Sequence, residues 1–153
     1  IVATGPNGIR SIPIDGFFHG FYQTELQPGE ILTEIQIPIP PKGTSSAYHK
    51  LERKVGDYAT AGCAVQITVD AKGVCTAAGI GLTNVNATPL RATRSQEALV
   101  GKPISDATIK AAATAASEDC NPSTDLRGSD EYKRHCIAVL IERMVHSAQS
   151  RIK

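Results

Sequence analysis

Alternation of hydrophobic and polar residues predicts four strands in the first half of the chain. Side chains of one kind recur at every second position, which is the period of a pleated strand. The predicted strands are Glu30–Ile39, Ala47–Arg53, about Ala61–Val69, and Val74–Leu82. One face of the last strand carries only small residues, among them Gly79 and Gly81. We expect that face to admit another backbone or a flat group at close range.

The second half of the chain is predicted to be helical. A short helix over Thr93–Leu99 ends at Gly101, and Asp106 is expected to cap an alanine-rich helix that runs to about Glu118. Ser129 is expected to cap the longest helix. Its predicted buried stripe is Tyr132, Cys136, Val139, Leu140 and Met144. Strands followed by helices predict an α+β fold, with an antiparallel sheet of three to four strands packed on a C-terminal bundle of about three helices.

The first residues predict a separate, smaller piece of structure. Two short strands, Ile1–Ala3 and Ile9–Pro13, flank a Gly-Pro-Asn-Gly turn. Two strands alone are only marginally stable in water, so this piece must lean on the rest of the chain or on another polypeptide. All three phenylalanines then fall together beside a tyrosine, at Phe17, Phe18, Phe21 and Tyr22. The cluster indicates either a wedge between two domains or ordinary core packing.

Composition narrows the classes of function. With 153 residues and 41% hydrophobic residues, the chain is long enough for one core. A net charge of +1 gives no sign of nucleic-acid binding, and no apolar run predicts a transmembrane segment or signal peptide. Because the sequence begins at Ile1, we expect a fragment or a processed product.

The cysteines and histidines predict no metal site. Neither set has zinc, CxxC, HxH or HExxH spacing. The residues concerned are Cys63, Cys75, Cys120 and Cys136, with His19, His49, His135 and His146. We interpret the thiols as packing residues in a reducing compartment, which favours a cytoplasmic location.

The segment from Ala47 to Gly62 carries the most informative chemistry. Its strand period places Tyr48, Lys50 and Glu52 on one face, so an aromatic ring and a cation point the same way. The strand pattern stops at Gly56, and one acid, Asp57, follows before a run of small residues. Such a segment presents polar groups at a cleft, or it is a half-buried sheet edge with solvated charges. The residues alone leave both alternatives open.

Five motifs together carry a resemblance to a known family. They are YHKLERKVGDYATAG, FFHGFYQTELQPGEILTEIQIP, AGIGLTNVNATPLRA, SQEALVGKPI and DLRGSDEYKRHCIAVLIERM. In this order they resemble the FAD-binding (medium) subunit of molybdenum hydroxylases, of the carbon monoxide dehydrogenase flavoprotein type. The resemblance covers nearly the whole chain. It implies that residues 1–29 are the tail of the FAD-binding domain with a connector, and that residues 30–153 are the C-terminal domain.

The resemblance also implies which cofactor and which partner subunits the intact subunit has. In the intact subunit, FAD passes electrons from iron-sulfur clusters to an external acceptor, within a multi-subunit oxidoreductase of the carbon monoxide or aldehyde/xanthine dehydrogenase type. The expected partners are the iron-sulfur subunit, the molybdenum subunit and an N-terminal FAD-binding domain. That domain would hold the FAD diphosphate, since the Gly79-Ile80-Gly81 pattern lies in a predicted strand and opens no helix. We therefore expect the isolated chain to bind FAD weakly or not at all and to be inactive.

Four residues are the candidate cofactor-binding set, with no catalytic residue among them. Tyr48 would lie against or beside the isoalloxazine ring, and Lys50 would place positive charge near it. Arg53 and Asp57 are included, although an ion pair that fixes the bend is their favoured role. The xanthine dehydrogenase pattern has its lysine one position earlier, where this chain has His49.

Two other classes of function remain open at this point. A protein-interaction or assembly module without its own cofactor is the alternative, because the Phe17 to Tyr22 cluster and the small-residue face are both suited to docking. A small stand-alone enzyme is disfavoured, because no acid-base or nucleophile constellation is present.

Overall fold

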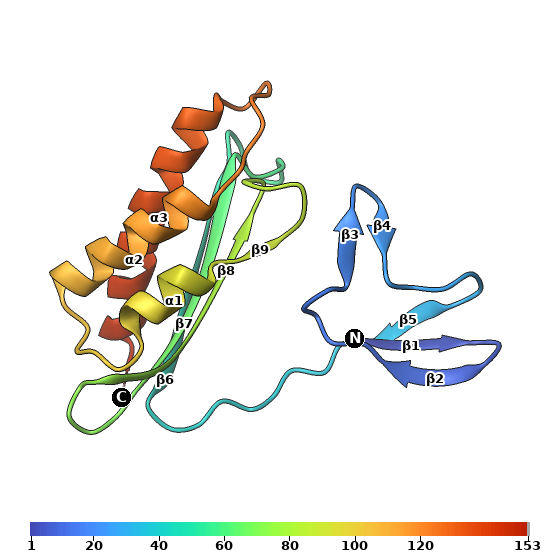
Figure 1. Cartoon of the computed structure of the whole chain (residues 1–153), viewed down its shortest axis with the longest axis horizontal. Helices are drawn as coiled ribbons and strands as arrows, with labels where there is room; N and C mark the ends of the chain where they lie inside the picture. The colour runs from blue at the N-terminus through green and yellow to red at the C-terminus, as the bar shows by residue number, and fades with distance from the viewer. Residues whose placement is uncertain (153) are drawn as a thin grey trace. The chain divides into compact units, whose positions relative to one another are not determined.

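The computed structural model describes residues 1–152, which form two units: Ile1–Pro40 and residues 41–152. In the first unit, β1 (Val2–Gly5) pairs with both β2 (Gly8–Ser11) and β5 (Ile31–Glu34) in a three-stranded antiparallel sheet. A second ribbon joins β3 (Phe18–Gly20) to β4 (Gln23–Thr24) (Figure 1).

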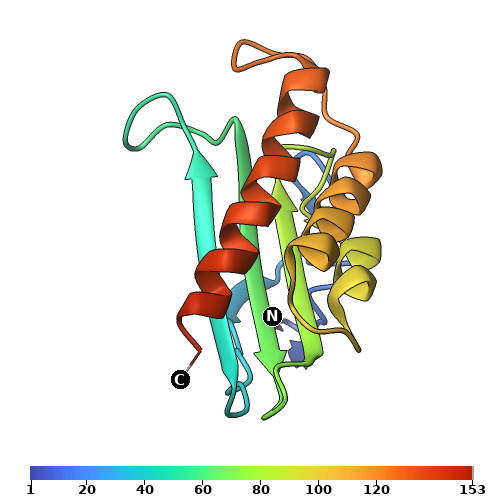
Figure 2. The ribbon, with the colours of Figure 1, turned by 90° about the vertical axis from the view of Figure 1, so that its left-hand side faces the viewer.

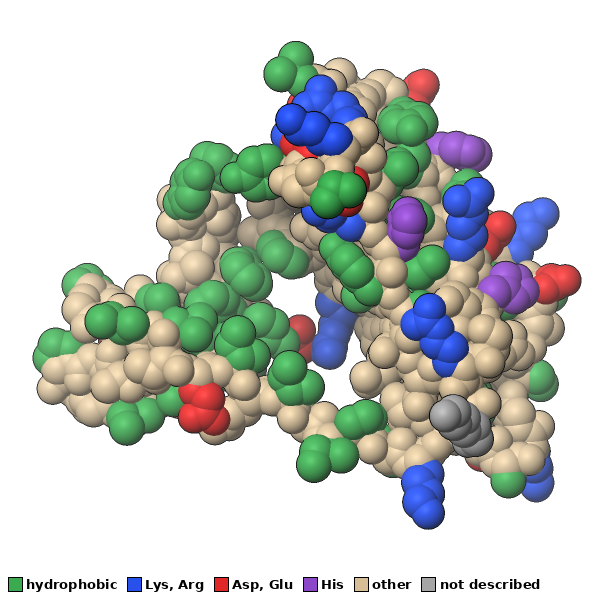
Figure 3. All heavy atoms as spheres, turned by 180° about the vertical axis from the view of Figure 1, so that it is seen from behind, with side chains coloured by type: hydrophobic (Ala, Val, Ile, Leu, Met, Phe, Trp, Pro, Cys, Tyr) green, Lys and Arg blue, Asp and Glu red, His purple; other side chains and the backbone are tan. Residues whose placement is uncertain are grey.

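The core of the first unit is small. Its buried hydrophobic residues are Val2, Ala3, Ile12 and Phe17, of which the last three form one cluster. Phe17 therefore packs in a core, whereas Phe21 and Tyr22 are 83% and 93% exposed. Figure 3 shows hydrophobic side chains gathered over this unit. A unit with so little buried apolar area carries more exposed apolar surface than a stable lone domain does.

The predicted strand Glu30–Ile39 is wrong in length. Only Ile31–Glu34 is a strand, and it pairs with β1 rather than with the main sheet. Pro38, Pro40 and Pro41 lack the N–H that a sheet ladder requires, so the segment after Glu34 cannot continue the pairing on both sides. The first unit extends to Pro40, so β5 belongs to it.

The second unit is a four-stranded antiparallel sheet with helices on one face (Figure 2). The strand order is β6 (Thr44–Leu51), β7 (Ala61–Val69), β8 (Cys75–Thr83) and β9 (Leu90–Arg91). The helices are α1 (Thr93–Leu99), α2 (Asp106–Asp119) and α3 (Asp130–Ser150). The predicted α+β class is confirmed. The fourth strand of the sheet is β9, which the sequence did not predict.

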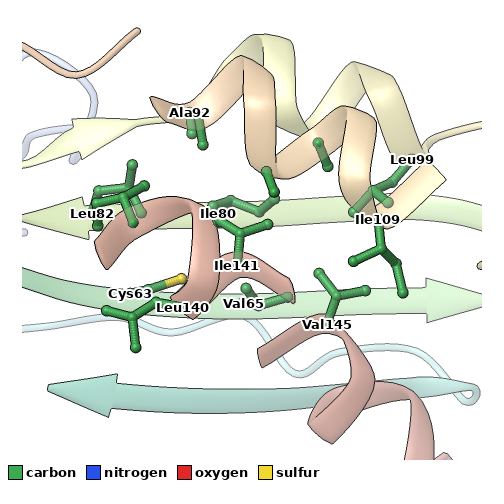
Figure 4. Close-up of a cluster of buried hydrophobic side chains, with 14 of the residues drawn as sticks. Cys63, Val65, Ile80, Leu82, Ala92, Leu99, Ile109, Leu140, Ile141 and Val145 are labelled. Carbon is green, nitrogen blue, oxygen red and sulfur yellow. The ribbon is translucent and has the colours of Figure 1, made fainter. Parts of the chain in front are cut away.

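The core of the second unit lies between the sheet and the helices. Figure 4 shows Cys63, Val65, Ile80 and Leu82 of the sheet facing side chains of all three helices. The helical contribution includes Leu99, Ile109, Leu140, Ile141 and Val145. All four cysteines are free and buried, as the packing interpretation predicted. Burial raises the pKa of the Cys63 thiol to about 12 and that of Cys120 to about 11.

The helix ends confirm one predicted cap and correct another. Ser129 caps α3, because its Oγ accepts a hydrogen bond from Tyr132 N at 3.1 Å. The cap of α2 is Ser105 rather than Asp106. Ser105 and Thr108 exchange side-chain and backbone hydrogen bonds in a capping box, and Asp106 is the first helical residue.

The buried stripe of α3 differs in part from its prediction. Cys136 and Leu140 are buried, but Tyr132 is 48% exposed. Val139 and Met144 are half-buried. The stripe continues instead through Ile137, Ile141, Val145 and Ala148. In residues 1–152, every helix is too short or too polar to span a bilayer.

Candidate functional site

The two predicted site residues of β6 lie on the face of the sheet opposite the helices. Tyr48 pairs with Ala64, which pairs with Gly81, and paired residues of antiparallel strands share a face. Lys50 pairs with Gly62 in the same way. Ala47, which precedes Tyr48 and points to the other face, pairs with Val65 and is buried in the core under the helices. The predicted common face of Tyr48 and Lys50 is therefore confirmed.

Small residues border Tyr48 on this face. Tyr48 itself is 61% exposed. A Cβ built on Gly81 would meet no atom within 4 Å, so the space above this strand is open. The surface beside Tyr48 is thus a low shelf on which a flat group can lie without displacing a side chain.

Lys50 is held at the end of β6 by two oxygens. Its Nζ lies 2.6 Å from Glu52 Oε2 in an ion pair and donates a hydrogen bond of 2.9 Å to the carbonyl of Asp57. The Glu52 carboxylate raises the pKa of Lys50, so the ammonium is charged at neutral pH. The strand and the following bend together fix a cation on the same face as Tyr48.

Asp57 organises the bend that follows β6. Its Oδ2 accepts a hydrogen bond of 3.0 Å from Arg53 Nε, and its Oδ1 accepts one of 2.8 Å from Tyr58 N. The Arg53 hydrogen bond is the main reason why the pKa of Asp57 lies below its usual value. The ion pair expected between Arg53 and Asp57 is present, and its geometry is that of a clip across a turn.

Sequence reasoning missed Arg127, which joins this cluster from the loop between α2 and α3. Its Nη2 donates to Asp57 Oδ1 at 3.2 Å, and its guanidinium lies 5.4 Å from the centre of the Tyr58 ring. Asp57 is therefore shared by two guanidinium groups. Arg127 belongs to the quoted DLRGSDEYKRH motif, but nothing local in that motif indicates a partner 70 residues earlier.

A hollow of about 230 Å³ lies beside Tyr58. It is bordered by the loop between β8 and β9, whose Asn84 adopts a left-handed conformation with φ of 60°. Asn84 Nδ2 donates to the carbonyls of Ala59 and Thr60 at 2.7 and 3.1 Å, which ties this loop to the end of the bend. The remaining wall residues are Thr83, Asn86, Ala87, Thr88 and Pro89.

Comparison with known proteins identifies relatives along almost the whole chain. The family model described as CO dehydrogenase flavoprotein C-terminal domain matches residues 46–148. The carbon monoxide dehydrogenase medium chain of Afipia carboxidovorans is 43% identical over 150 residues, which are 98% of this chain and 52% of the relative. The xanthine dehydrogenase FAD-binding subunit of Escherichia coli O157:H7 is 28% identical over 145 residues, 94% of this chain and 49% of that subunit.

Solved structures agree with these sequence matches. Carbon monoxide dehydrogenase from Hydrogenophaga pseudoflava matches with a TM-score of 0.95 and 43% identity, over 99% of this chain and 53% of that one. Quinoline 2-oxidoreductase from Pseudomonas putida 86 matches with a TM-score of 0.87 and 31% identity, over 97% and 51%. The chain spans about half the length of the relatives that it matches. This chain belongs to the CO dehydrogenase flavoprotein C-terminal domain family, and it aligns with one half of the medium subunits of that family.

Proposed function

We propose that the chain is the C-terminal part of the flavoprotein subunit of a molybdenum hydroxylase, where it helps to position FAD for electron transfer. The observation that carries the proposal is the pairing of an exposed Tyr48 with a fixed cation, Lys50, beside the small-residue shelf. A flat aromatic ring fits such a shelf. When bound, FAD supplies the redox chemistry, and the protein orients it and tunes its electronics.

In this proposal Tyr48 contacts the ring and Lys50 sets the charge at its edge. Glu52 and the Asp57 carbonyl fix the position of the Lys50 ammonium, so it needs little reorganisation to act on nearby negative charge. Arg53 and Asp57 remain in the proposed cofactor-binding set as the clip that fixes the bend. None of the four moves a proton in this proposal.

The exposed side chains of the first unit suggest that the two units belong to different domains of the subunit. Its exposed Phe21, Tyr22 and Ile31 are consistent with a piece that completes a larger domain. We propose that β1, β2 and β5 belong to the FAD-binding domain, and that the second unit is the C-terminal domain. The proposed setting is a cytoplasmic enzyme with separate iron-sulfur and molybdenum subunits.

Substitution in the complete subunit tests the roles of Tyr48 and Lys50. We expect Tyr48→Ala and Lys50→Ala each to change the flavin midpoint potential or its reoxidation rate, while FAD content stays near normal, because diphosphate contacts lie elsewhere. The matched control is His49→Ala, an exposed residue between them on the other face of β6. Potentials and acceptor kinetics equal to those of His49→Ala would assign Tyr48 and Lys50 a structural role only.

The iron-sulfur subunit is proposed to dock near residues 46–60. Val55 and Tyr58 are 95% and 81% exposed there, an unusual position for large apolar side chains on a lone domain. Helix α3 carries the charged side chains of Arg134 and Arg143 outside its buried stripe, so it is too polar to be the centre of such a contact. Cross-linking of the assembled complex checks this assignment, and links confined to residues 130–153 would contradict it.

A protein-interaction module without its own cofactor is the second candidate. The exposed Phe21 and Tyr22 rings, 4.4 Å apart, favour it, since such a pair suits a docking contact. A flavin absorption spectrum of the intact parent protein separates the two candidates.

A further inference from the structure

Lys133 is a buried cation in the first turn of α3. Its side chain is 1% exposed, and its Nζ lies 2.8 Å from Asp125 Oδ2 and donates a 2.8 Å hydrogen bond to the carbonyl of Ser123. A buried ammonium is costly in free energy unless its charge is paired, so breaking this ion pair would leave an unpaired charge in the interior. The loop of residues 120–129 is thereby held against the helix by the charge beneath it.

Asp125 passes this constraint on to Arg127. Its Oδ1 accepts a 2.8 Å hydrogen bond from Arg127 N, and its backbone bridges to Gly128 in both directions. The Lys133 hydrogen bond is the main reason why the pKa of Asp125 lies below its usual value, so the carboxylate is charged at neutral pH. The backbone of Arg127 is therefore positioned by the Asp125 carboxylate, and Lys133 holds that carboxylate in place.

Arg127 then reaches the bend of the candidate site. It contacts Asp57 Oδ1 and the Tyr58 ring, while its Nε is buried without an acceptor. The carbonyl of the same Asp57 accepts from Lys50 Nζ. Figure 2 shows the loop of residues 120–129 and the bend after β6 at the same end of the sheet.

We propose that Lys133 is a positioning residue for the site. Through Asp125 and Arg127 it holds the bend of residues 52–58, and with it the Lys50 ammonium, in one arrangement. The consequence for flavin rests on the proposed function given above. The coupling between loop and bend does not, because it is a property of this chain's own contacts.

Amide hydrogen exchange of the full chain tests the coupling directly. Lys133→Met removes the charge at similar length, and Arg127→Ala removes the bridge. We expect each to speed exchange at residues 52–58 about tenfold or more, as loss of a charge-assisted contact implies, while β7 stays protected. The two effects should be non-additive in the double variant, because they act along one path. Arg94→Met, which removes a cation pairing with Glu118 and Asp119, is the matched control and should leave the bend unchanged.

A milder variant keeps the test decisive if Lys133→Met unfolds. Asp125→Asn retains an oxygen for Arg127 N but weakens the charge pair, and it should loosen the same residues. Faster exchange confined to residues 120–129, or an Arg127→Ala variant with an unchanged bend, would overturn the proposal.

In the complete flavoprotein, Lys133→Met should shift the flavin potential in the same direction as Lys50→Ala, by a smaller amount, and add nothing to it in the double variant. If exchange shows coupling but Lys50→Ala leaves the potential unchanged, the proposed function fails and the positioning role stands. If exchange shows none, the positioning role fails whatever the potential does.

Discussion

Gly62 shows how one missing side chain shapes the face that bears the site. It stands between Lys50 and Thr83 in a row that crosses the sheet. A Cβ at this position would lie 2.7 Å from Thr83 Cγ2, closer than real contacts allow. Thr83 is β-branched and its χ1 angle is restricted in a strand, so the clash cannot be relieved without strain.

Gly62→Ala should therefore lower the free energy of unfolding of the second unit by about 1 kcal/mol or more. Urea denaturation measures this change. The matched control is Gly81→Ala in the neighbouring strand, where a Cβ meets nothing and the effect should be neutral or slightly stabilising. Adding Thr83→Ser to Gly62→Ala removes the clashing methyl group and should restore stability. Equal stabilities for the two alanine variants would mean that the Thr83 contact relaxes freely.

Glu30 is the residue that makes the first unit sensitive to acid. Arg10 binds its carboxylate through Nε at 2.8 Å and Nη2 at 3.0 Å, and this pairing lowers the pKa of Glu30 from 4.5 to about 2. A carboxyl group whose pKa is lowered in the folded state stabilises that state at any pH above the pKa of the unfolded chain. This contribution to stability is lost as the pH falls toward the lower pKa of the folded state. The pairing between β5 and β1 should thus weaken between pH 4.5 and about 2.

An NMR titration of the β1 and β2 amides checks this expectation. Glu30→Gln should remove the acid transition and leave the unit already loosened at neutral pH. Glu34→Gln, at an exposed position at the end of β5, is the control and should keep the transition. A transition unchanged by Glu30→Gln would assign the acid response to other carboxylates.

At the scale of elements, α3 depends on how it begins. Ser129 caps it, and Asp130 and Glu131 lie in the first turn where negative charge favours the helix dipole. The same turn carries Lys133, so the cap and the buried charge lie within one turn of each other. A weakened start of α3 should therefore affect both the core and the loop that carries Arg127.

Ser129→Ala should lower the free energy of unfolding by about 1 kcal/mol, because the N–H of Tyr132 loses its acceptor. Ser150→Ala in the last turn, where the hydroxyl donates only to the Ser147 carbonyl, is the matched control and should change little. Chemical denaturation monitored by circular dichroism measures both. A negligible cost at Ser129 would mean that water or the backbone replaces the cap.

At the scale of the whole molecule, the chain combines a well-packed unit with a poorly packed one. The second unit buries a continuous core between sheet and helices, whereas the buried hydrophobic cluster of the first unit consists of Ala3, Ile12 and Phe17. Marginal units of this size usually rely on further contacts. This contrast agrees with relatives that are about twice as long as the matched region.

The isolated chain should bind FAD only weakly. Gly79 and Gly81 lie within β8 and do not open a helix, so this pattern cannot hold the diphosphate as a dinucleotide loop does. Contacts to the isoalloxazine ring alone would then have to offset the whole loss of translational and rotational freedom when FAD binds. Calorimetric titration is the measurement, and a dissociation constant below about 1 μM would contradict the expectation.

The sequence alone was sufficient for the elements whose signals are local. The Ala61–Val69 strand, the Thr93–Leu99 helix and the Ser129 cap follow from period, propensity and capping chemistry within a few residues. The common face of Tyr48 and Lys50 follows from the two-residue period in the same way. These signals lie within a few neighbouring residues, so they can be inferred without knowing which distant segments meet.

Tertiary structure decided everything that depends on which distant segments meet. The strand over Ile31–Glu34 pairs with β1 rather than β6, and Arg127 binds Asp57 across 70 residues of chain. No periodicity encodes such partners, because they result from the packing of whole elements and the closure of long loops. The burial of Lys133, whose charge by itself favours solvent, has the same origin. The loop of residues 120–129 supplies the Asp125 carboxylate and the Ser123 carbonyl that make this burial tolerable.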